Sequence, residues 1–560
     1  MIHTRQSKQT TDDTEISKSK VATAFGRSDT NINFSLNQRA KELPNIESLK
    51  SDERDLLSTI IQLCITGSLE GIEEKLDDLS EDCPFVRTRD KKGYCAIHYA
   101  SNRDGEDAIQ IIKILINHGA KLDDRTSKGI TVLHIACVNG NVALCKHCLT
   151  VDSTAEFINT EDYKGWSASL FAAFHGHISI LKYLKESNNM MKMTSDKTGE
   201  NILQLACLAK NMNVYRYIKD TYPVLKRDKD KEGRTILHYI ARGGNTNILE
   251  DLLKGPEKHG SKTFHASEWA KKEFKKSHKI NPLHISCLYG HEQMSRDLIS
   301  QFPNMLHETD EDGLHAVYYA AIGGNVSVMS FLKEILNDIV HRFSISENIN
   351  INILQMACIY EKTEMAIFIA KTFPYLLWKK DHDGWCIHHL AAKCGNLKFL
   401  KFLIEEKQEK ARHVVDPCSK DNLGRTILHI ACLYGNYEIC EYLVSAFPAM
   451  TRERDIDDCP ACVLAARGGS VCAINLLFDK SISFINEVDK TNMSYAAKCS
   501  EKVEIIQLIE EKISRTTSKE IHLDETVASG CEVNIEMETI ELTEKKHQKT
   551  RGTLESTVIN

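Results

Sequence analysis

The sequence has no long apolar run. None of its segments approaches the ~18 consecutive apolar residues of a membrane-spanning helix, and the first eight residues, Met1–Lys8, lack the apolar core of a secretory leader. The formal net charge of −7 is small for 560 residues and gives no general reason to expect a nucleic-acid partner. Without an export signal, the 19 cysteines are expected to be reduced thiols. We therefore expect a cytoplasmic protein, with nuclear entry left open.

Two further absences narrow the chemistry and bound the folded part. No glycine-rich phosphate loop follows a predicted strand, because the Gly-Gly pairs at positions 243, 323 and 468 end predicted helices. Residues 1–50 are polar and have no sustained apolar period, and residues 513–560 contain a stretch that alternates acidic and apolar side chains. Such compositions bury too little surface to offset the entropy of ordering, so we predict disordered termini.

What the sequence does contain is a repeated phrase. Its fullest copy is Gly424-Arg-Thr-Ile-Leu-His-Ile-Ala-Cys-Leu-Tyr-Gly435, and close copies begin at Gly129 and Gly233. The alanine of this phrase, or a residue in its place, recurs from position 100 to position 496 at intervals of 31 to 46 residues, which makes twelve units. A period of this size predicts units that stack on one another and share one elongated core.

The phrase resembles the T-P-L-H-x-A signature of the ankyrin-repeat family. The resemblance covers residues 55–512. It implies an all-α solenoid of helix-turn-helix units with short β-turn fingers, whose first helices and fingertips hold protein partners. We predict a disordered segment at 1–50, a capping helical pair at 51–88, the repeat array at 89–512 and a disordered acidic-hydrophobic tail at 513–560.

The resemblance also assigns a structural role to a Thr and a His, which in the family bond within and between units. The positions that match both are Thr131 and His134, Thr235 and His238, and Thr426 and His429. The positions that match the His alone are His98, His284 and His389. The residues that replace the His are Leu170, Gln204, Tyr318, Gln355, Val463 and Ser494. We predict that the third, eleventh and twelfth units open most easily.

A second period of two units overlies the first. The even-numbered units from four to ten share an aromatic-proline ending: Tyr222-Pro223, Phe302-Pro303, Phe373-Pro374 and Phe447-Pro448. Extra residues enter only after the second helix of units five, seven and nine. Insertions confined to one side of a repeat array often mark its binding face.

Several cysteine clusters have the spacing of metal or redox sites. Cys145-Lys-His-Cys148 looks like half of a zinc site, and Cys459-Pro-Ala-Cys462 looks like a redox or zinc pair. However, Cys145, Cys148 and Cys462 coincide with core positions of the repeat. Cys386 beside His388 and His389 suggests a Cys-His nucleophile. However, both histidines occupy motif positions, and neighbours on a helix point to different faces. We predict no catalytic residue, no metal ion and no cofactor.

The insertion at 254–279 is the most distinctive of the extra segments. It is rich in lysine, and Trp269 lies on a possible apolar face surrounded by Lys271, Lys272, Lys275 and Lys276. One interpretation is a docking element for an acidic protein or an anionic lipid head group. The other is a solvated loop whose Trp269 folds back onto the array.

Two other features are candidates for partner contact. Tyr289, Tyr360 and Tyr434 end first helices and match interface anchors by type, although alternation with the smaller Gly323, Cys394 and Gly468 also suits packing between units. The fingertips change from basic or neutral early in the array to acidic later. This gradient would orient a partner, and solvated turns explain the same residues.

These features predict a non-enzymatic scaffold or adaptor that binds one or more proteins through fingertips, concave groove and one-sided loops. Membrane contact is expected only through a partner or the basic insertion. The alternative is a truncated or alternative product of a TRPA-type ion channel, whose cytosolic ankyrin region the array loosely resembles in length and in its irregular loops. A longer product that continues into apolar 20-residue runs would favour that alternative.

Overall fold

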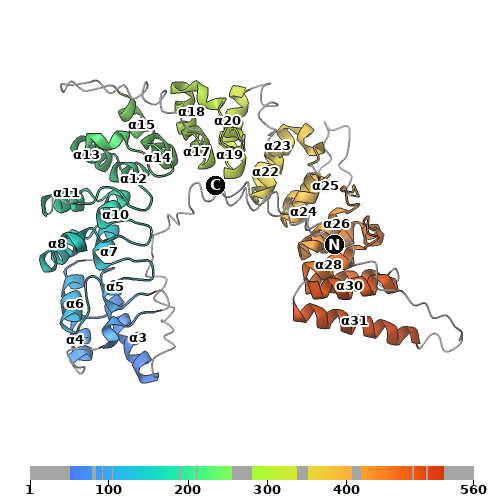
Figure 1. Ribbon diagram of the computed structural model, residues 1–560, viewed down its shortest axis with the longest axis horizontal. Coiled ribbons are helices and arrows are strands. Elements are labelled where there is room, and N and C mark those ends of the chain that lie inside the picture. Colours follow the sequence, from blue (N-terminus) through green and yellow to red (C-terminus); the bar gives the residue numbers. More distant parts are fainter. Residues whose placement is uncertain are drawn as a thin grey trace, which may run out of the picture. The chain divides into compact units, whose positions relative to one another are not determined.

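The computed structural model describes residues 51–521 apart from 78–83, 91–92, 104, 188–190, 210, 255–279, 337–350, 382, 406–417, 482–484 and 500–501. The chain divides into two compact units, Met1–Ile430 and Ala431–Asn560. Each is a series of short helices paired through tight loops (Figure 1). Within the described residues no β-strand occurs, and three isolated β-bridges close the bases of fingers.

The first compact unit starts with a cap and continues as helical pairs. The cap comprises α3 (Ser51–Thr66), α4 (Leu69–Asp77) and the 3-10 helix η1 (Pro84–Arg87). The first helices are α5 (Ala96–Ala100), α7 (Val132–Asn139), α10 (Ala168–His175), α12 (Ile202–Leu208), α14 (Ile236–Gly243), α17 (Pro282–Leu288), α19 (Ala316–Gly323), α22 (Ile353–Ile359), α24 (Ile387–Lys393) and α26 (Ile427–Leu433). The division between the compact units falls within α26.

The second helices of the same units run beside them (Figure 1). They are α6 (Glu106–Asn117), α8 (Val142–Val151), α11 (Ile178–Ser187), α13 (Met212–Thr221), α15 (Thr246–Leu253), α18 (Glu292–Gln301), α20 (Val326–Leu336), α23 (Thr363–Thr372) and α25 (Leu397–Glu405). A short extra helix, α9 (Ala155–Ile158), follows α8. The second compact unit contains α27 (Tyr437–Ala446), α28 (Ala461–Gly468), α29 (Val471–Ser481), α30 (Glu487–Cys499) and α31 (Val503–Ile521).

The two helices of a unit differ in how they are buried. In α7 every residue from Val132 to Cys137 is buried, because this helix lies between the first helices of its neighbours, α5 and α10. In α8 the buried residues form one stripe, Leu144, Cys145, Cys148 and Leu149, and the remaining residues are half-buried or exposed. First helices therefore build a continuous core, and amphipathic second helices cover it.

The aromatic-proline endings have one shared geometry. Tyr222, Phe302, Phe373 and Phe447 each end a second helix with φ between −126° and −136° and ψ of 66–68°. Each following proline starts a 3-10 helix. These helices are η2 (Pro223–Arg227), η3 (Pro303–Leu306), η5 (Pro374–Trp378) and η6 (Pro448–Arg452). Proline excludes the α conformation from the residue before it, so the aromatic residue ends the helix. The insertions of the odd units lie outside the described residues.

The end of the array differs from the prediction in two respects. Helix α31 continues to Ile521, beyond the predicted boundary at residue 512. Helix α30 starts at Glu487, where Asn486 and Asp489 each accept the backbone N–H of the other at 2.8–3.0 Å. The prediction that Ser494 takes the position of the motif histidine was therefore wrong. Asp489 holds that position, because α30 starts earlier in the chain than the repeat period indicates.

Candidate interaction surface

The fingers are tight turns held by one side chain and one glycine. Asp230 Oδ1 accepts the backbone N–H groups of Glu232 at 2.9 Å and Arg234 at 2.8 Å. Gly233 closes the turn with φ +77°, a conformation that favours glycine. Asp162, Asp310, Asp381, Asp421 and Asp455 accept the same two N–H groups in their own fingers. The tips therefore have a defined backbone without forming strands.

In most units a capping pair fixes the finger to its first helix. The Nδ1 atom of His134 accepts the backbone N–H of Thr131 at 3.1 Å, and Thr131 caps the backbone of His134 in return. The same reciprocal pair joins Thr235 to His238 and Asn281 to His284. Thr426 N–H donates to His429 Nδ1 at 3.2 Å. Cysteine takes the cap position before His98 and His389.

The far ring nitrogen of the histidine links neighbouring units. Nε2 lies 3.0 Å from Asp124 O in His98, 3.2 Å from Trp166 O in His134, and 3.0 Å from Ile280 O in His238. His284 instead stacks its ring on Tyr319, with centroids 4.8 Å apart. Burial lowers the pKa of these imidazoles, to about 4 in His134 and His238 and to about 3 in His284. These four histidines are therefore neutral near pH 7.

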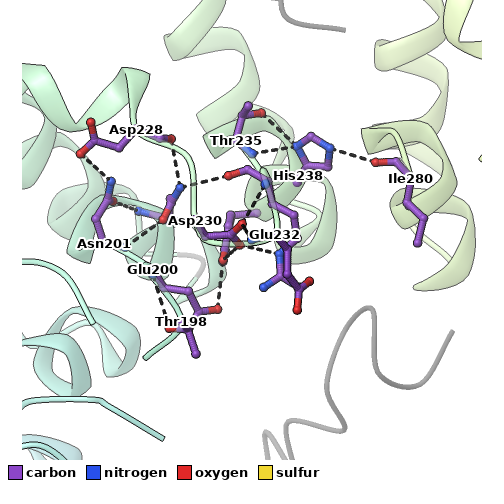
Figure 2. A network of polar contacts seen from close by, with 12 residues as sticks. Thr198, Glu200, Asn201, Asp228, Asp230, Glu232, Thr235, His238 and Ile280 are labelled. Atoms are coloured by element: carbon purple, nitrogen blue, oxygen red, sulfur yellow. Dashed lines mark hydrogen bonds and ion pairs between the residues drawn. The ribbon is translucent and has the colours of Figure 1, made fainter. Parts of the chain in front are cut away.

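A buried network carries the connection from one finger to the next (Figure 2). The Tyr239 hydroxyl lies 2.7 Å from Asp230 Oδ2 and 3.0 Å from Glu200 Oε1. The other oxygen of Glu200 accepts the Trp166 indole N–H at 3.0 Å and the Thr198 hydroxyl at 3.0 Å. Units three, four and five are thereby joined through the buried Glu200, Asp230 and Tyr239 and the half-buried Trp166, which favours a rigid row of fingers.

The tips of four consecutive fingers carry exposed lysines: Lys128, Lys164, Lys197 and Lys231. Successive tips touch, because Tyr163 N–H donates to Lys128 O at 3.0 Å and Lys231 N–H donates to Thr198 O at 3.0 Å. We call Lys128, Tyr163, Lys164, Lys197 and Lys231 the basic fingertip row.

Tyr163 gives this row an aromatic centre. Its side chain is 61% exposed. Lys197 Nζ donates to its carbonyl oxygen at 2.7 Å and lies 5.9 Å from its ring centroid. The carboxylates of Asp196 and Glu232 next to the row pair with Lys192 and Arg234, which stand outside it. The row therefore keeps its positive charge beside an exposed aromatic ring.

The later fingers have the opposite charge. Glu311 and Asp312 form the tip after Asp310, and Asp383 lies in the next described finger. In the second compact unit, Asp457 and Asp458 are exposed at the tip. The acidic side chains thus lie at the tips of the later fingers, where the sequence predicted them. Recognition of this change of charge by a partner stays a prediction.

The three candidate tyrosines stand where first helices end. Tyr289 is 41% exposed, and the Arg242 guanidinium lies 5.6 Å from its ring centroid. Tyr360 and Tyr434 are half-buried. A Cβ at Gly323 would lie 2.2 Å from Leu288 O. The absence of a side chain at Gly323 therefore allows the backbones of α17 and α19 to approach closely. Partner contact by these tyrosines stays a prediction. Trp269, Lys271, Lys272, Lys275 and Lys276 lie outside the described residues.

The cysteine clusters separate into two kinds. Cys145, Cys148 and Cys462 are buried in the core, and Cys459 is half-buried. Cys386 differs, because its Sγ lies 3.2 Å from His388 Nε2 and 2.9 Å from His389 Nδ1. The prediction that the side chains of Cys386, His388 and His389 point to different faces was wrong. Cys386 is the cap residue with extended backbone (φ −94°, ψ 173°), so helical spacing does not apply to it.

Comparison with known proteins agrees with the repeat geometry. The family described as ankyrin repeats (3 copies) matches residues 60–156, 97–196, 170–262 and 354–452. The chain belongs to the ankyrin-repeat family. Its members are generally non-catalytic modules for protein-protein interaction, and the all-α ankyrin solenoid predicted from the sequence is confirmed.

Two curated ankyrin-repeat relatives are similar over part of the chain. The I-Kappa-B like protein F1 of Microplitis demolitor bracovirus (isolate Webb) is 29% identical over 93 residues, 16% of this chain and 57% of that protein. The probable 26S proteasome regulatory subunit p28 of Saccharomyces cerevisiae is 23% identical over 209 residues, 37% of this chain and 74% of that protein. The chain thus spans little more than half the length of the first of these relatives.

The channel alternative finds no support in these comparisons. Neither relative is named as an ion channel, and the resemblance to TRPA-type channels is not shown. In the part of the chain that the structure describes, no helix combines the length and the apolar character needed to cross a bilayer.

Proposed function

We propose that this ankyrin-repeat protein is a non-catalytic cytoplasmic scaffold or adaptor, and that the basic fingertip row holds an acidic segment of a protein partner. One observation supports this choice above the others. Four exposed lysines and the exposed Tyr163 stand on consecutive fingers that hydrogen bonds join to one another, through backbone N–H groups at two junctions and through Lys197 Nζ at the third.

Both the lysines and Tyr163 would contribute to binding. Lysines spaced along rigid turns meet an extended acidic segment with little loss of backbone entropy, because the fingers are already ordered. An exposed tyrosine between them supplies apolar contact area, and charged groups around it fix the orientation of the partner. The name of one relative describes it as a regulatory subunit of the 26S proteasome, which suits a role in binding.

The test is affinity purification with three versions of the full chain. The first is unaltered, and the second carries Lys128→Glu, Lys164→Glu, Lys197→Glu and Lys231→Glu. The third is a matched control with the same charge change in the same part of the array. It carries Lys113→Glu, Lys146→Glu, Lys182→Glu and Lys185→Glu on the exposed faces of α6, α8 and α11.

We expect partners to remain bound to the unaltered chain and to the helix control, and to be lost from the fingertip variant. Binding should also weaken as NaCl rises, since exposed charges are screened over about 8–10 Å near physiological salt. Recovery of the same proteins in the same amounts with the fingertip variant would refute the proposal.

A further inference from the structure

Three side chains that ligate metals meet at the start of α24. Cys386 Sγ, a ring nitrogen of His388 and a ring nitrogen of His389 all lie within 4.8 Å of one another, and all three residues are buried. Over the described ranges this is the one group of three or more Cys, His or acidic residues with such a geometry. The group lies far from the basic fingertip row in sequence and has no part in the proposed docking of a partner.

The pair of Cys386 and His389 also occurs in the first unit, whereas His388 has no counterpart there. Cys95 and His98 form the same cap, with Sγ 3.1 Å from Nδ1 and the Cys95 N–H donating to Nδ1 at 3.2 Å. There the residue before the His is Ile97, fully buried. A Cys-His cap is therefore complete without a third ligand.

His388 is the unusual member. In most other units the equivalent residue is apolar, and in the third unit it is the small, buried Ser169. The apolar ones include Ile97, Leu133, Leu203, Leu237, Leu283, Leu354 and Leu428. His388 is only 2% exposed, and its Nδ1 is buried without a hydrogen-bond partner within the described structure. Placing an imidazole in this apolar position costs solvation free energy. The cap does not need this side chain, whose Nε2 contacts Ser419 Oγ at 2.7 Å while Nδ1 has no partner among the described residues.

The distances suit a metal ion of zinc's size. Zinc bonds of about 2.3 Å to sulfur and about 2.0–2.1 Å to nitrogen give ligand separations of roughly 3.3–3.6 Å in a tetrahedron. The sulfur lies 3.2 Å and 2.9 Å from the two nitrogens, so it would have to move away from them by roughly 0.3–0.7 Å to admit the ion. Ser419 Oγ, 2.7 Å from His388 Nε2 and 3.6 Å from Cys386 Sγ, borders the fourth position.

The second contacts of His389 also suit ligation. Its Nε2 lies 3.2 Å from Arg425 O, the carbonyl contact that commonly orients a metal-binding imidazole. Its Nδ1 accepts the Cys386 N–H at 3.3 Å, the longest of the six histidine caps in the described units. Metal binding would replace the weakest of these hydrogen bonds.

We propose that Cys386, His388 and His389 form a binding site for one zinc ion. Sulfur and imidazole ligands together favour zinc over magnesium or calcium. Binding exchanges the thiol proton of Cys386 for the metal, so one proton is released to solvent and no electron is transferred. The bound ion would join α24 to the segment before the Asp421 finger, on which Ser419 stands.

The test uses Co²⁺ as a spectroscopic substitute for zinc in the full chain. Two variants remove one ligand each while keeping the local fold. Cys386→Thr recreates the Thr-His cap of Thr131 and His134, and His388→Leu restores the residue found at Leu428. Cys95→Thr is the matched control, because it changes the Cys-His cap that has no third ligand. Circular dichroism checks that each variant is folded.

We expect the unaltered chain and Cys95→Thr to bind one equivalent of Co²⁺ with a thiolate-to-cobalt charge-transfer band that zinc abolishes, and both other variants to lose this band. A second readout is alkylation of Cys386, followed by peptide mass spectrometry. It should be slowed by zinc in the unaltered chain and not in His388→Leu. If the unaltered chain shows no thiolate band, or if either ligand variant keeps it, the proposed site is wrong.

Discussion

Gln204 and Asn201 form, in the fourth unit, the same reciprocal pair that a histidine forms elsewhere. The Asn201 N–H donates to Gln204 Oε1 at 2.8 Å, and the Gln204 N–H donates to Asn201 Oδ1 at 2.9 Å. Gln204 Nε2 then donates to Asp228 O at 3.2 Å, toward the next unit. The neutral amide of Gln204 therefore caps the helix and contacts the next unit as the imidazole does elsewhere, but it does not titrate.

The first prediction follows from this substitution. In the unfolded chain His134 has a pKa near 6.5, whereas burial lowers its pKa in the folded chain to about 4. Between pH 6.5 and 4 only the unfolded chain binds this proton, so acid favours unfolding. The free energy of unfolding should fall by about 1.4 kcal/mol per pH unit for each such histidine. Full stability is present above pH 6.5.

His134→Gln tests this directly. We expect the variant to keep the cap and to lose about 1.4 kcal/mol per unit of the pH dependence between pH 6.5 and 4. Urea unfolding at several pH values measures it. His147→Gln, on the half-buried part of α8, is the control and should change the slope less. An unchanged slope in His134→Gln would show that His134 is not the group that acid protonates.

The second prediction concerns the network between fingers. Tyr239→Phe removes the hydroxyl beside Glu200 and Asp230 and leaves both buried carboxylates with one donor fewer. We expect a loss of about 1–3 kcal/mol in the free energy of unfolding. Tyr163→Phe, which alters an exposed ring, should stay within about 0.5 kcal/mol of the unaltered chain. Equal stability of the two variants would contradict the role of the network.

The third prediction tests the close approach of first helices. An alanine at Gly323 would place Cβ 2.2 Å from Leu288 O, so backbone must shift. We expect Gly323→Ala to destabilise by about 1–3 kcal/mol, as overpacking does. At Gly71 in α4 the nearest atom is the Ser68 hydroxyl, at 3.2 Å, and alanine is the better helix former. Gly71→Ala should be neutral or stabilising by up to about 1 kcal/mol. Thermal unfolding distinguishes the two.

The fourth prediction concerns local opening. Helices α10 and α28 have no side-chain cap at Ser167 and Pro460, whereas α7 is capped by Thr131. Amides in the first turns of α10 and α28 should exchange with deuterium faster than those of α7. The twelfth unit was also predicted to open easily, but we now expect α30 to exchange slowly, like α7, because Asn486 and Asp489 cap it. Equal rates of amide exchange in α7, α10, α28 and α30 would show that stacking of the units, and not capping, controls local opening.

Much of the architecture could be predicted because its determinants are local. Thr131 and His134 are three residues apart, and a cap of this kind depends on that spacing and on the extended backbone before a helix. The aromatic-proline endings are also local, since proline restricts the residue that precedes it. These signals recur in most units or in every second one, so the number of units and the order of helices could be read along the chain.

The candidate sites could be predicted only in part, for reasons of geometry. The lysines of the fingertips are visible in the sequence, but the contact between Tyr163 and Lys128 depends on how one finger lies on the next. Cys386 and His388 meet because the cap residue has extended backbone, a fact that helical periodicity does not contain. Asp489 took the capping role because α30 starts earlier than the repeat period indicates.

The sequence by itself determined the repeat, its period and the local turns and caps, because each rests on contacts between residues a few positions apart. Only the tertiary structure decided which carbonyl each histidine reaches, which lysines form one row and that Cys386, His388 and His389 share one buried space. Those relationships join residues of different units or of non-helical backbone, and stacking sets their distances.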